Sequence, residues 1–160
     1  MSFSEQLVNL LTDKKLKISA AESCTGGMFI SSLVSVAGSS AVIGASYITY
    51  SDEAKIKTVG VSADTINTFG VVSENVALEM ATGAAKAACA DIGVGITGYA
   101  GPASDENDTT VGTVCFGFYI GGKTLTSTKH FGDVGRNVVR ELSCVYATDM
   151  LIRLIGKFCK

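Results

Sequence analysis

The sequence predicts an α/β fold, a three-layer α/β/α sandwich with a mixed, largely parallel sheet and a late antiparallel hairpin. Helical and strand patterns alternate through the first two thirds of the chain. Near the end, two strand-like segments flank Gly121-Gly122, which is typical of a tight hairpin turn. No repeat or linker divides the 160 residues, so we expect one domain over residues 1–160.

The composition excludes several classes of protein. Hydrophobic residues make up 47% and charged residues 18%, with one proline, which excludes a disordered chain. A net charge of −2 argues against a dedicated nucleic-acid binder. No apolar stretch is long enough for a transmembrane helix, and the polar N-terminus does not resemble a signal peptide. We therefore expect a cytoplasmic protein with neither a nucleic-acid nor a membrane partner.

The residues that usually bind metals are sparse. None of the five cysteines has CxxC spacing, so zinc and thioredoxin-type sites are disfavoured. His130 is the single histidine, which excludes every motif that needs two. The sequence therefore predicts no metal and no other cofactor.

Capping residues and apolar periodicity define the elements of the first half. Ser2 and Glu5 form a capping-box pattern, and Ser51 precedes a short helical segment that Gly60 closes. The expected elements are a helix ending near residue 14, a strand over 16–21, a helix over 28–36, a strand over 42–50 and a helix over 51–57.

The second half follows the same logic. Ser62 and Ser73 are expected helix caps, and the face Val76, Met80, Ala84 and Ala87 of the second helix should point inward. Strands are expected over 92–97, 111–120 and 124–131, with a polar loop over 103–110. The last helix, 136–158, should bury one apolar stripe: Val139, Leu142, Val145, Tyr146, Met150 and Leu154.

Glycine-rich turns follow two of the strands. Ser23 lies between a strand and a helix start, where the N–H groups of Thr25, Gly26 and Gly27 are expected to be unpaired within the helix. Such groups can hold a phosphate or a developing oxyanion. The alternative is that Ser23 and Thr25 only cap the helix and the glycines only form the turn.

The second glycine-rich turn, with Gly98 and Gly101, is expected at the same edge of the sheet. Cys24 is a rival nucleophile to Ser23, because a helix N-terminus can lower the pKa of a thiol. Cysteine is also commonly buried as a small hydrophobe, and the sequence leaves both options open.

Tyr50 and Lys55 cluster after the second strand. A lysine acts as a general base only when neutral, which requires desolvation or nearby positive charge. The alternative is a solvated helix lysine. Arg136 and Arg140, at i and i+4 of the last helix, can bind a phosphate or pair with nearby carboxylates.

Several sequence blocks resemble the CinA C-terminal domain family. They occur in family order across nearly the whole chain, over residues 21–27, 38–42, 48–55, 60–62, 70–74, 97–102 and 111–114. Free-standing members are nicotinamide mononucleotide deamidases (PncC), which release ammonia and leave nicotinate mononucleotide. The resemblance also implies self-association, most often as a homodimer.

The resemblance implies a role for each candidate residue. Ser23 would be the nucleophile, Lys55 its base and Tyr50 the third catalytic partner. The N–H groups of the two glycine-rich turns and the two arginines of the last helix are expected to bind the substrate. These residues are Thr25, Gly26, Gly27, Gly98, Gly101, Arg136 and Arg140.

The chain departs from the family pattern at three places. Asp52 stands where most members have asparagine, two extra residues separate Asp133 from Arg136, and the 103–110 loop contains no lysine. Asp52 and the loop motivate an alternative, a nucleotide-binding paralogue with little or no activity. The family name alone suggests a third, an assembly partner in DNA uptake or damage response.

Overall fold

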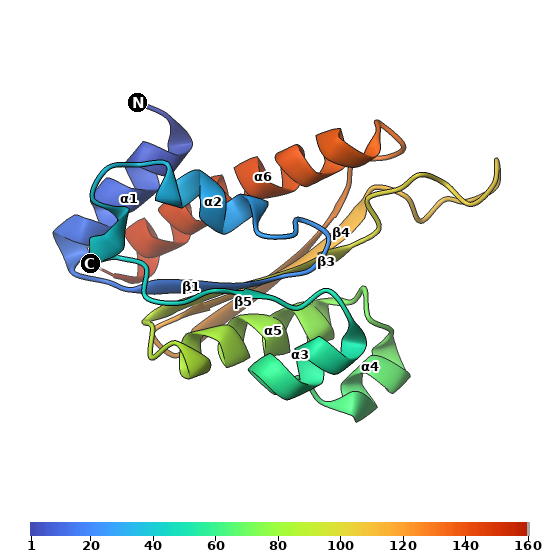
Figure 1. Ribbon diagram of the computed structural model, residues 1–160, viewed down its shortest axis with the longest axis horizontal. Coiled ribbons are helices and arrows are strands. Elements are labelled where there is room, and N and C mark those ends of the chain that lie inside the picture. The colour runs from blue at the N-terminus through green and yellow to red at the C-terminus, as the bar shows by residue number, and fades with distance from the viewer. Residues whose placement is uncertain (160) are drawn as a thin grey trace.

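A five-stranded mixed sheet lies between two layers of helices (Figure 1). The computed structural model describes residues 1–159. Its elements are α1 (Phe3–Lys14), β1 (Ile18–Glu22), α2 (Met28–Val34), a 3-10 turn η1 (Ser39–Ala41), β2 (Tyr47–Ile48), α3 (Asp52–Val59), α4 (Ala63–Phe69), α5 (Glu74–Ala87), β3 (Ile92–Gly98), β4 (Thr113–Ile120), β5 (Lys123–His130) and α6 (Arg136–Phe158).

The sheet has the strand order β2-β1-β3-β4-β5. β1 is parallel to both β2 and β3, whereas β3, β4 and β5 pair antiparallel. Helices α1, α2 and α6 cover one face, and α3, α4 and α5 cover the other (Figure 1). The predicted fold class, including the late hairpin, is confirmed.

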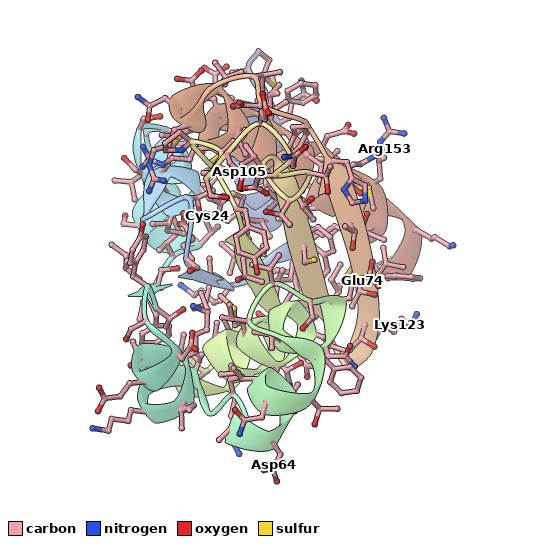
Figure 2. All side chains as sticks on the ribbon, turned by 90° about the vertical axis from the view of Figure 1, so that its right-hand side faces the viewer. Cys24, Asp64, Glu74, Asp105, Lys123 and Arg153 are labelled. Atoms are coloured by element: carbon pink, nitrogen blue, oxygen red, sulfur yellow. The ribbon has the colours of Figure 1, made fainter. Side chains whose placement is uncertain are left out.

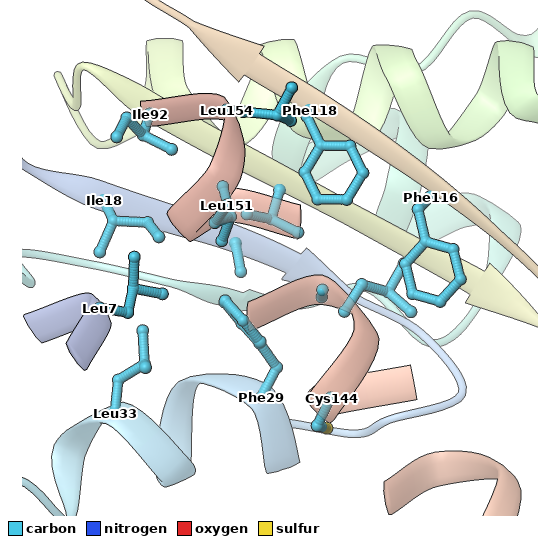
Figure 3. Close-up of a cluster of buried hydrophobic side chains, with 14 of the residues drawn as sticks. Leu7, Ile18, Phe29, Leu33, Ile92, Phe116, Phe118, Cys144, Leu151 and Leu154 are labelled. Carbon is cyan, nitrogen blue, oxygen red and sulfur yellow. The ribbon is translucent and has the colours of Figure 1, made fainter. Parts of the chain in front are cut away.

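The larger hydrophobic core lies between the sheet and the layer of α1, α2 and α6 (Figure 3). Leu7, Phe29 and Leu33 from the helices meet Phe116 and Ile18 from the strands, and all five are fully buried. Burying large apolar side chains supplies most of the driving force for folding. This core therefore fixes α2, and with it the turn that precedes α2, against the end of β1.

The opposite layer packs through small residues instead. A Cβ atom at Gly95 would overlap the carbonyl oxygen of Ala77, and one at Gly93 would overlap that of Ala81. Gly117 of β4 makes room for Ala77 in the same way. The backbone of α5 can therefore approach the sheet closely, as glycine permits.

Two expectations about helix faces are wrong in part. Leu142 and Val145 of α6 are 40% and 49% exposed, although the predicted stripe buries them. The buried face instead includes Ser143 and Thr148, whose hydroxyls donate to carbonyls one turn earlier and so need no external partner. Ala87, at the end of α5, is exposed rather than inward-facing.

The expected strand over 42–50 is also too long. Only Tyr47–Ile48 pairs as β2, with one isolated bridge between Ile18 and Ile43. The Ser46 hydroxyl accepts from the N–H of Ala20 (2.7 Å) and donates to its carbonyl (3.1 Å). This side chain takes the place of ladder bonds that a longer strand would make to β1.

Among the described residues, 1–159, no helix is both long enough and apolar enough to cross a membrane.

Candidate active site

Ser23 is the first residue after β1, at the edge of the sheet where the parallel strands β1 and β3 both end. Its N–H donates to the carbonyl of Ile96 (2.9 Å) and extends the pairing with β3. Gly26 and Gly27 follow with φ of 58° and 93°, which glycine adopts without strain, and the chain turns into α2. The Ser23 side chain is only 9% exposed and borders a pocket.

Lys55 reaches this serine from α3, on the opposite layer. Ser51 caps α3 through its hydroxyl, which places Lys55 one turn in and facing the sheet. Its side chain is 1% exposed. The Lys55 Nζ atom lies 3.1 Å from Ser23 Oγ, 2.9 Å from the Thr49 carbonyl oxygen and 3.5 Å from that of Tyr50. The structure therefore brings the predicted nucleophile and base into hydrogen-bond contact.

The surroundings of Lys55 favour its neutral form. Burial lowers the pKa of Lys55 below 10.5, because desolvation penalises the charged ammonium. Asp52 and, more weakly, Cys24 act in the opposite direction and raise the pKa of Lys55. Burial is the larger effect, so the net shift is downward.

The Lys55 Nζ atom donates to Ser23 Oγ and to the Thr49 and Tyr50 carbonyls, and a neutral amine can keep the two carbonyl bonds. A neutral amine has two N–H groups and one lone pair. The Thr49 and Tyr50 carbonyl oxygens can accept the two hydrogens, which leaves the lone pair directed at Ser23 Oγ. In this neutral form the serine hydroxyl donates to Lys55, the reverse of the Nζ–H donation to Ser23 Oγ that the charged ammonium makes, as proton transfer from serine requires.

Cys24 is not placed as the nucleophile. Its side chain is 6% exposed and belongs to the large hydrophobic core. Burial raises the pKa of the Cys24 thiol to about 11, so the thiolate is scarce at neutral pH. The structure favours Ser23 over Cys24 at this turn.

Glu22 is a site residue that the sequence analysis missed. Its carboxylate, buried beneath the turn, accepts the N–H groups of Gly27 (3.0 Å), Phe29 (3.0 Å) and Ile30 (2.9 Å). A carboxylate at a helix N-terminus satisfies unpaired donors and complements the helix dipole. A glutamate at the end of an otherwise apolar strand, just before a glycine turn and a helix, is the sequence signal for this role.

The N–H groups of Gly26 and Gly27 are unpaired within α2, as expected, but both have acceptors elsewhere and are not free for a ligand. Gly27 donates to Glu22, and Gly26 donates to the Ser23 carbonyl (3.0 Å). Within residues 1–159, the N–H groups of Cys24 and Thr25 have no hydrogen-bond acceptor. These two, rather than the glycines, are available to a developing oxyanion beside Ser23.

Replacing Glu22 by glutamine should destabilise the protein. The amide keeps one acceptor oxygen but sets an NH₂ group against backbone N–H donors that need an acceptor. Losing charge-assisted bonds in a buried place costs about 2–4 kcal/mol of unfolding free energy. Urea denaturation of Glu22→Gln and wild type measures this loss, with Glu53→Gln on exposed α3 as the control. An unchanged midpoint would contradict the capping role.

Tyr50 and Arg136 form the outer wall of the site. Tyr50 is 61% exposed. Its hydroxyl accepts a hydrogen bond from Arg136 Nη2 (3.0 Å), and Arg136 Nη1 donates to the Gly101 carbonyl (2.6 Å). The Tyr50 hydroxyl thus pairs with Arg136, while Lys55 and Ser23 pair with each other directly.

Arg140 lies on the other side of the turn. Its Nε donates to the Cys24 carbonyl (3.0 Å) and its Nη2 to the Thr25 carbonyl (3.1 Å), while Nη1 donates to Asn137 (3.0 Å). Arg140 does not border the pocket. The two arginines expected to act together therefore have separate partners.

A pocket of about 330 Å³ lies at the carboxyl edge of the sheet. Its wall includes Ser23, Lys55, Tyr50 and Arg136. Figure 2 looks onto this end of the molecule, with Cys24 of the turn and Asp105 of the 103–110 loop labelled. Of the predicted substrate-binding residues, Gly98, Gly101 and Arg136 border the pocket, whereas Thr25, Gly26 and Gly27 do not. The rest of its wall is Cys24, Asp52, Val71, Val72, Thr97, Tyr99, Ala100, Pro102, Asp108, Thr110 and Val111.

Fold and site together define an α/β protein with a buried serine–lysine pair at the carboxyl edge of a mixed sheet. The model of the CinA C-terminal domain family matches residues 1–155. The chain belongs to this family.

Similar proteins support the same assignment. The chain is 46% identical over 154 residues to a CinA-like protein of Kosmotoga olearia and 42% identical over 153 residues to a competence-damage inducible protein of Alkaliphilus oremlandii. Each match covers 96% of this chain but 37% of the relative. The chain thus spans little more than a third of the length of these relatives.

Solved structures match over nearly their full length. A CinA superfamily protein of Escherichia coli superposes with a TM-score of 0.89 at 38% identity, covering 95% of this chain and 88% of that one. A competence/damage inducible protein of Agrobacterium tumefaciens gives 0.87 at 38% identity and covers 96% of both chains.

Proposed function

We propose that this chain is an amidohydrolase that converts nicotinamide mononucleotide and water into nicotinate mononucleotide and ammonia. The observation that carries the proposal is the buried Lys55 Nζ, 3.1 Å from Ser23 Oγ, at the wall of a pocket. The class of chemistry rests on this pair. The choice of pyridine nucleotide rests on the resemblance to free-standing members of the CinA C-terminal domain family.

The first half of the reaction forms an acyl-enzyme. Ser23 Oγ attacks the carboxamide carbon while its proton passes to neutral Lys55. The carbonyl oxygen becomes an oxyanion, for which the N–H groups of Cys24 and Thr25 are available donors. When the C–N bond breaks, the Lys55 ammonium gives its proton to the leaving nitrogen, which departs as ammonia.

The second half releases the acid. Water takes the place that ammonia left and attacks the acyl carbon while Lys55 accepts its proton. The ester bond to Ser23 breaks, and the proton on Lys55 returns to the serine oxygen. The products are the carboxylic acid and the enzyme in its starting state.

Groups on the pocket wall would hold the rest of the substrate. Arg136 is the arginine that borders the pocket, so we assign the 5′-phosphate to it. The backbone around Gly98 and Gly101 forms the facing wall, and Tyr50 lies between Arg136 and the reacting pair. A volume of about 330 Å³ is within the range of small-ligand sites.

The proposal is tested by incubating the purified protein with nicotinamide mononucleotide. Ammonia and nicotinate mononucleotide should appear in equal amounts, measured by a coupled enzyme assay and by chromatography. The second candidate, a nucleotide-binding paralogue without turnover, is favoured by Asp52, because its carboxylate raises the pKa of Lys55. Calorimetric binding without product would support that candidate and refute the amidase.

Replacing Asp52 by asparagine should move the acid limb of kcat/KM to lower pH. Lys55 must be neutral to accept a proton, so the rate falls as pH drops below the pKa of Lys55. The Asp52 carboxylate stabilises the ammonium and raises that pKa. Removing the charge lowers the pKa, so the active form persists at lower pH.

The matched control is Glu53→Gln, one residue further along α3. Glu53 is exposed and pairs with Lys57 (2.6 Å). Its variant should keep the wild-type pH profile. An acid limb in Asp52→Asn that stays in place or moves to higher pH would show that Asp52 does not act on the catalytic base.

A further inference from the structure

Arg136 and Arg140 are one turn apart on α6 but serve different parts of the molecule. Arg136 points to the pocket wall, where it binds the Tyr50 hydroxyl and the Gly101 carbonyl. Arg140 points to the turn after Ser23 and is partly buried against it. The difference in partners indicates a difference in role.

Each of the three guanidinium nitrogens of Arg140 donates a hydrogen bond within the protein. Nε and Nη2 bind two successive carbonyls, those of Cys24 and Thr25, and Nη1 binds the side chain of Asn137. A planar fork that binds two neighbouring carbonyls fixes the orientation of both peptide planes. A lysine ammonium has three N–H donors on one nitrogen but lacks the fixed planar spacing of the guanidinium, so it holds the two peptide planes less precisely.

The peptide planes that Arg140 holds determine where the oxyanion donors point. In a trans peptide the C=O of one residue and the N–H of the next point in opposite directions. Holding the Cys24 carbonyl toward Arg140 therefore aims the Thr25 N–H away from Arg140. That N–H is one of the two in this turn, with that of Cys24, that have no acceptor within residues 1–159.

Glu22 also holds this turn in place, but as a hydrogen-bond acceptor where Arg140 is a donor. Arg140 binds carbonyl oxygens of the turn, and Glu22 binds N–H groups just after it. A Cβ at Gly26 would meet Arg140 Nη2 at 3.6 Å, so the arginine lies directly against the turn.

We propose that Arg140 is a positioning residue that orients the Thr25 N–H, and with it the oxyanion site beside Ser23, and that it does not bind the substrate phosphate. The inference rests on the proposed amidase function for its substrate assay. Its second readout, chemical labelling of Ser23, needs no assumption about the substrate.

The first experiment compares two substrates that differ only in the phosphate, nicotinamide mononucleotide and nicotinamide riboside. Arg140→Lys should lower kcat by about 10- to 100-fold with little change in KM, because geometry at the reacting centre is disturbed. The loss in kcat/KM should be equal for both substrates. Arg136→Lys, the comparator, should instead lower kcat/KM mainly for the nucleotide.

The second experiment measures the rate constant for labelling Ser23 with a fluorophosphonate. The serine oxygen bonds to phosphorus, fluoride leaves, and the serine proton goes to Lys55, while the phosphoryl oxygen occupies the oxyanion site. Arg140→Lys should slow labelling by about 10- to 100-fold. The rate constant does not depend on how much of the sample is folded, so a lower yield of folded protein does not mimic the effect.

Two further variants complete the design. Asn137→Ala removes the α6 partner of Arg140 and should slow labelling in the same direction, by about 2- to 5-fold, while Arg140 keeps its charge. Arg153→Lys, an exposed arginine on the same helix, should label at the wild-type rate. If Arg140→Lys does not fold, Asn137→Ala carries the test.

The outcomes separate the two proposals. Slow labelling of the Arg140 and Asn137 variants supports the positioning role even if the wild type releases no ammonia from the nucleotide, which would refute only the proposed substrate. Labelling at the wild-type rate, or a loss of activity confined to the phosphorylated substrate, would overturn the positioning role.

Discussion

Replacing Ser23 by alanine is expected to lower kcat for ammonia release by about 10⁴-fold or more. The variant retains the pocket and Lys55, but no oxygen remains to form the acyl-enzyme. Any residual rate must come from direct attack of water, with Lys55 as base. Removing a nucleophile generally costs far more than removing one supporting contact.

The measurement is steady-state ammonia release from nicotinamide mononucleotide, together with mass spectrometry of the protein after rapid acid quench. Wild type should show an acyl adduct on Ser23, and Ser23→Ala should show none. Ser39→Ala is the matched control, because Ser39 is also 9% exposed and its hydroxyl donates to the Val34 carbonyl, away from the pocket. A Ser23→Ala variant with wild-type turnover would refute the mechanism.

Replacing Lys55 by methionine is expected to lower kcat by about 10³- to 10⁴-fold, the upper part of the range for a general base. Methionine fills similar space at this buried position but cannot accept a proton. The residual rate should lose the acid limb that the titration of Lys55 imposes on the wild-type profile.

Lys57→Met is the control for this substitution, because it removes a lysine from the same helix whose side chain is 73% exposed. It should keep the wild-type rate and pH profile. Thermal unfolding of both variants checks that the fold is retained. A Lys55→Met enzyme within tenfold of wild type would show that another group accepts the serine proton.

Much of the fold could be predicted because local chemistry marks most element ends. The Ser2–Glu5 capping box, the Ser51 cap and the αL cap at Gly60 all form as expected. The predicted strand over 42–50 was too long because its apolar, β-branched composition is also compatible with an irregular segment. There the hydroxyl of Ser46 replaces backbone pairing, which a propensity pattern does not record.

Leu142 and Val145 of α6 are exposed, against the prediction, for a different reason. Apolar spacing on α6 fits two faces, and the choice between them depends on the neighbouring helices. The sheet and α1 select the face with small residues such as Ala147 and Ser143, which allows close packing. Sequence periodicity alone does not contain that information.

The proposed serine–lysine pair could be predicted because the resemblance to the family assigns both roles. The local signals, a serine in a strand–turn–helix junction and a lysine one turn after a cap, left a purely structural role open for each. The roles of Glu22 and Arg140 could not be predicted. Both bind backbone atoms, and which backbone groups lack partners is decided only when the turn has folded. A buried glutamate and a surface-helix arginine look like ordinary charges until those groups are known.

The proposed mechanism requires Lys55 to be neutral beside the Ser23 hydroxyl at a pH where ordinary lysines are charged. Its most direct test is an NMR titration of the lysine side chains with isotope-labelled protein, in which the Lys55 signal is assigned by its absence from Lys55→Met. We predict that the Lys55 amine loses its proton below pH 10.5, before the solvent-exposed lysines do. A Lys55 signal that titrates at or above pH 10.5 would refute its role as the base that accepts the Ser23 proton.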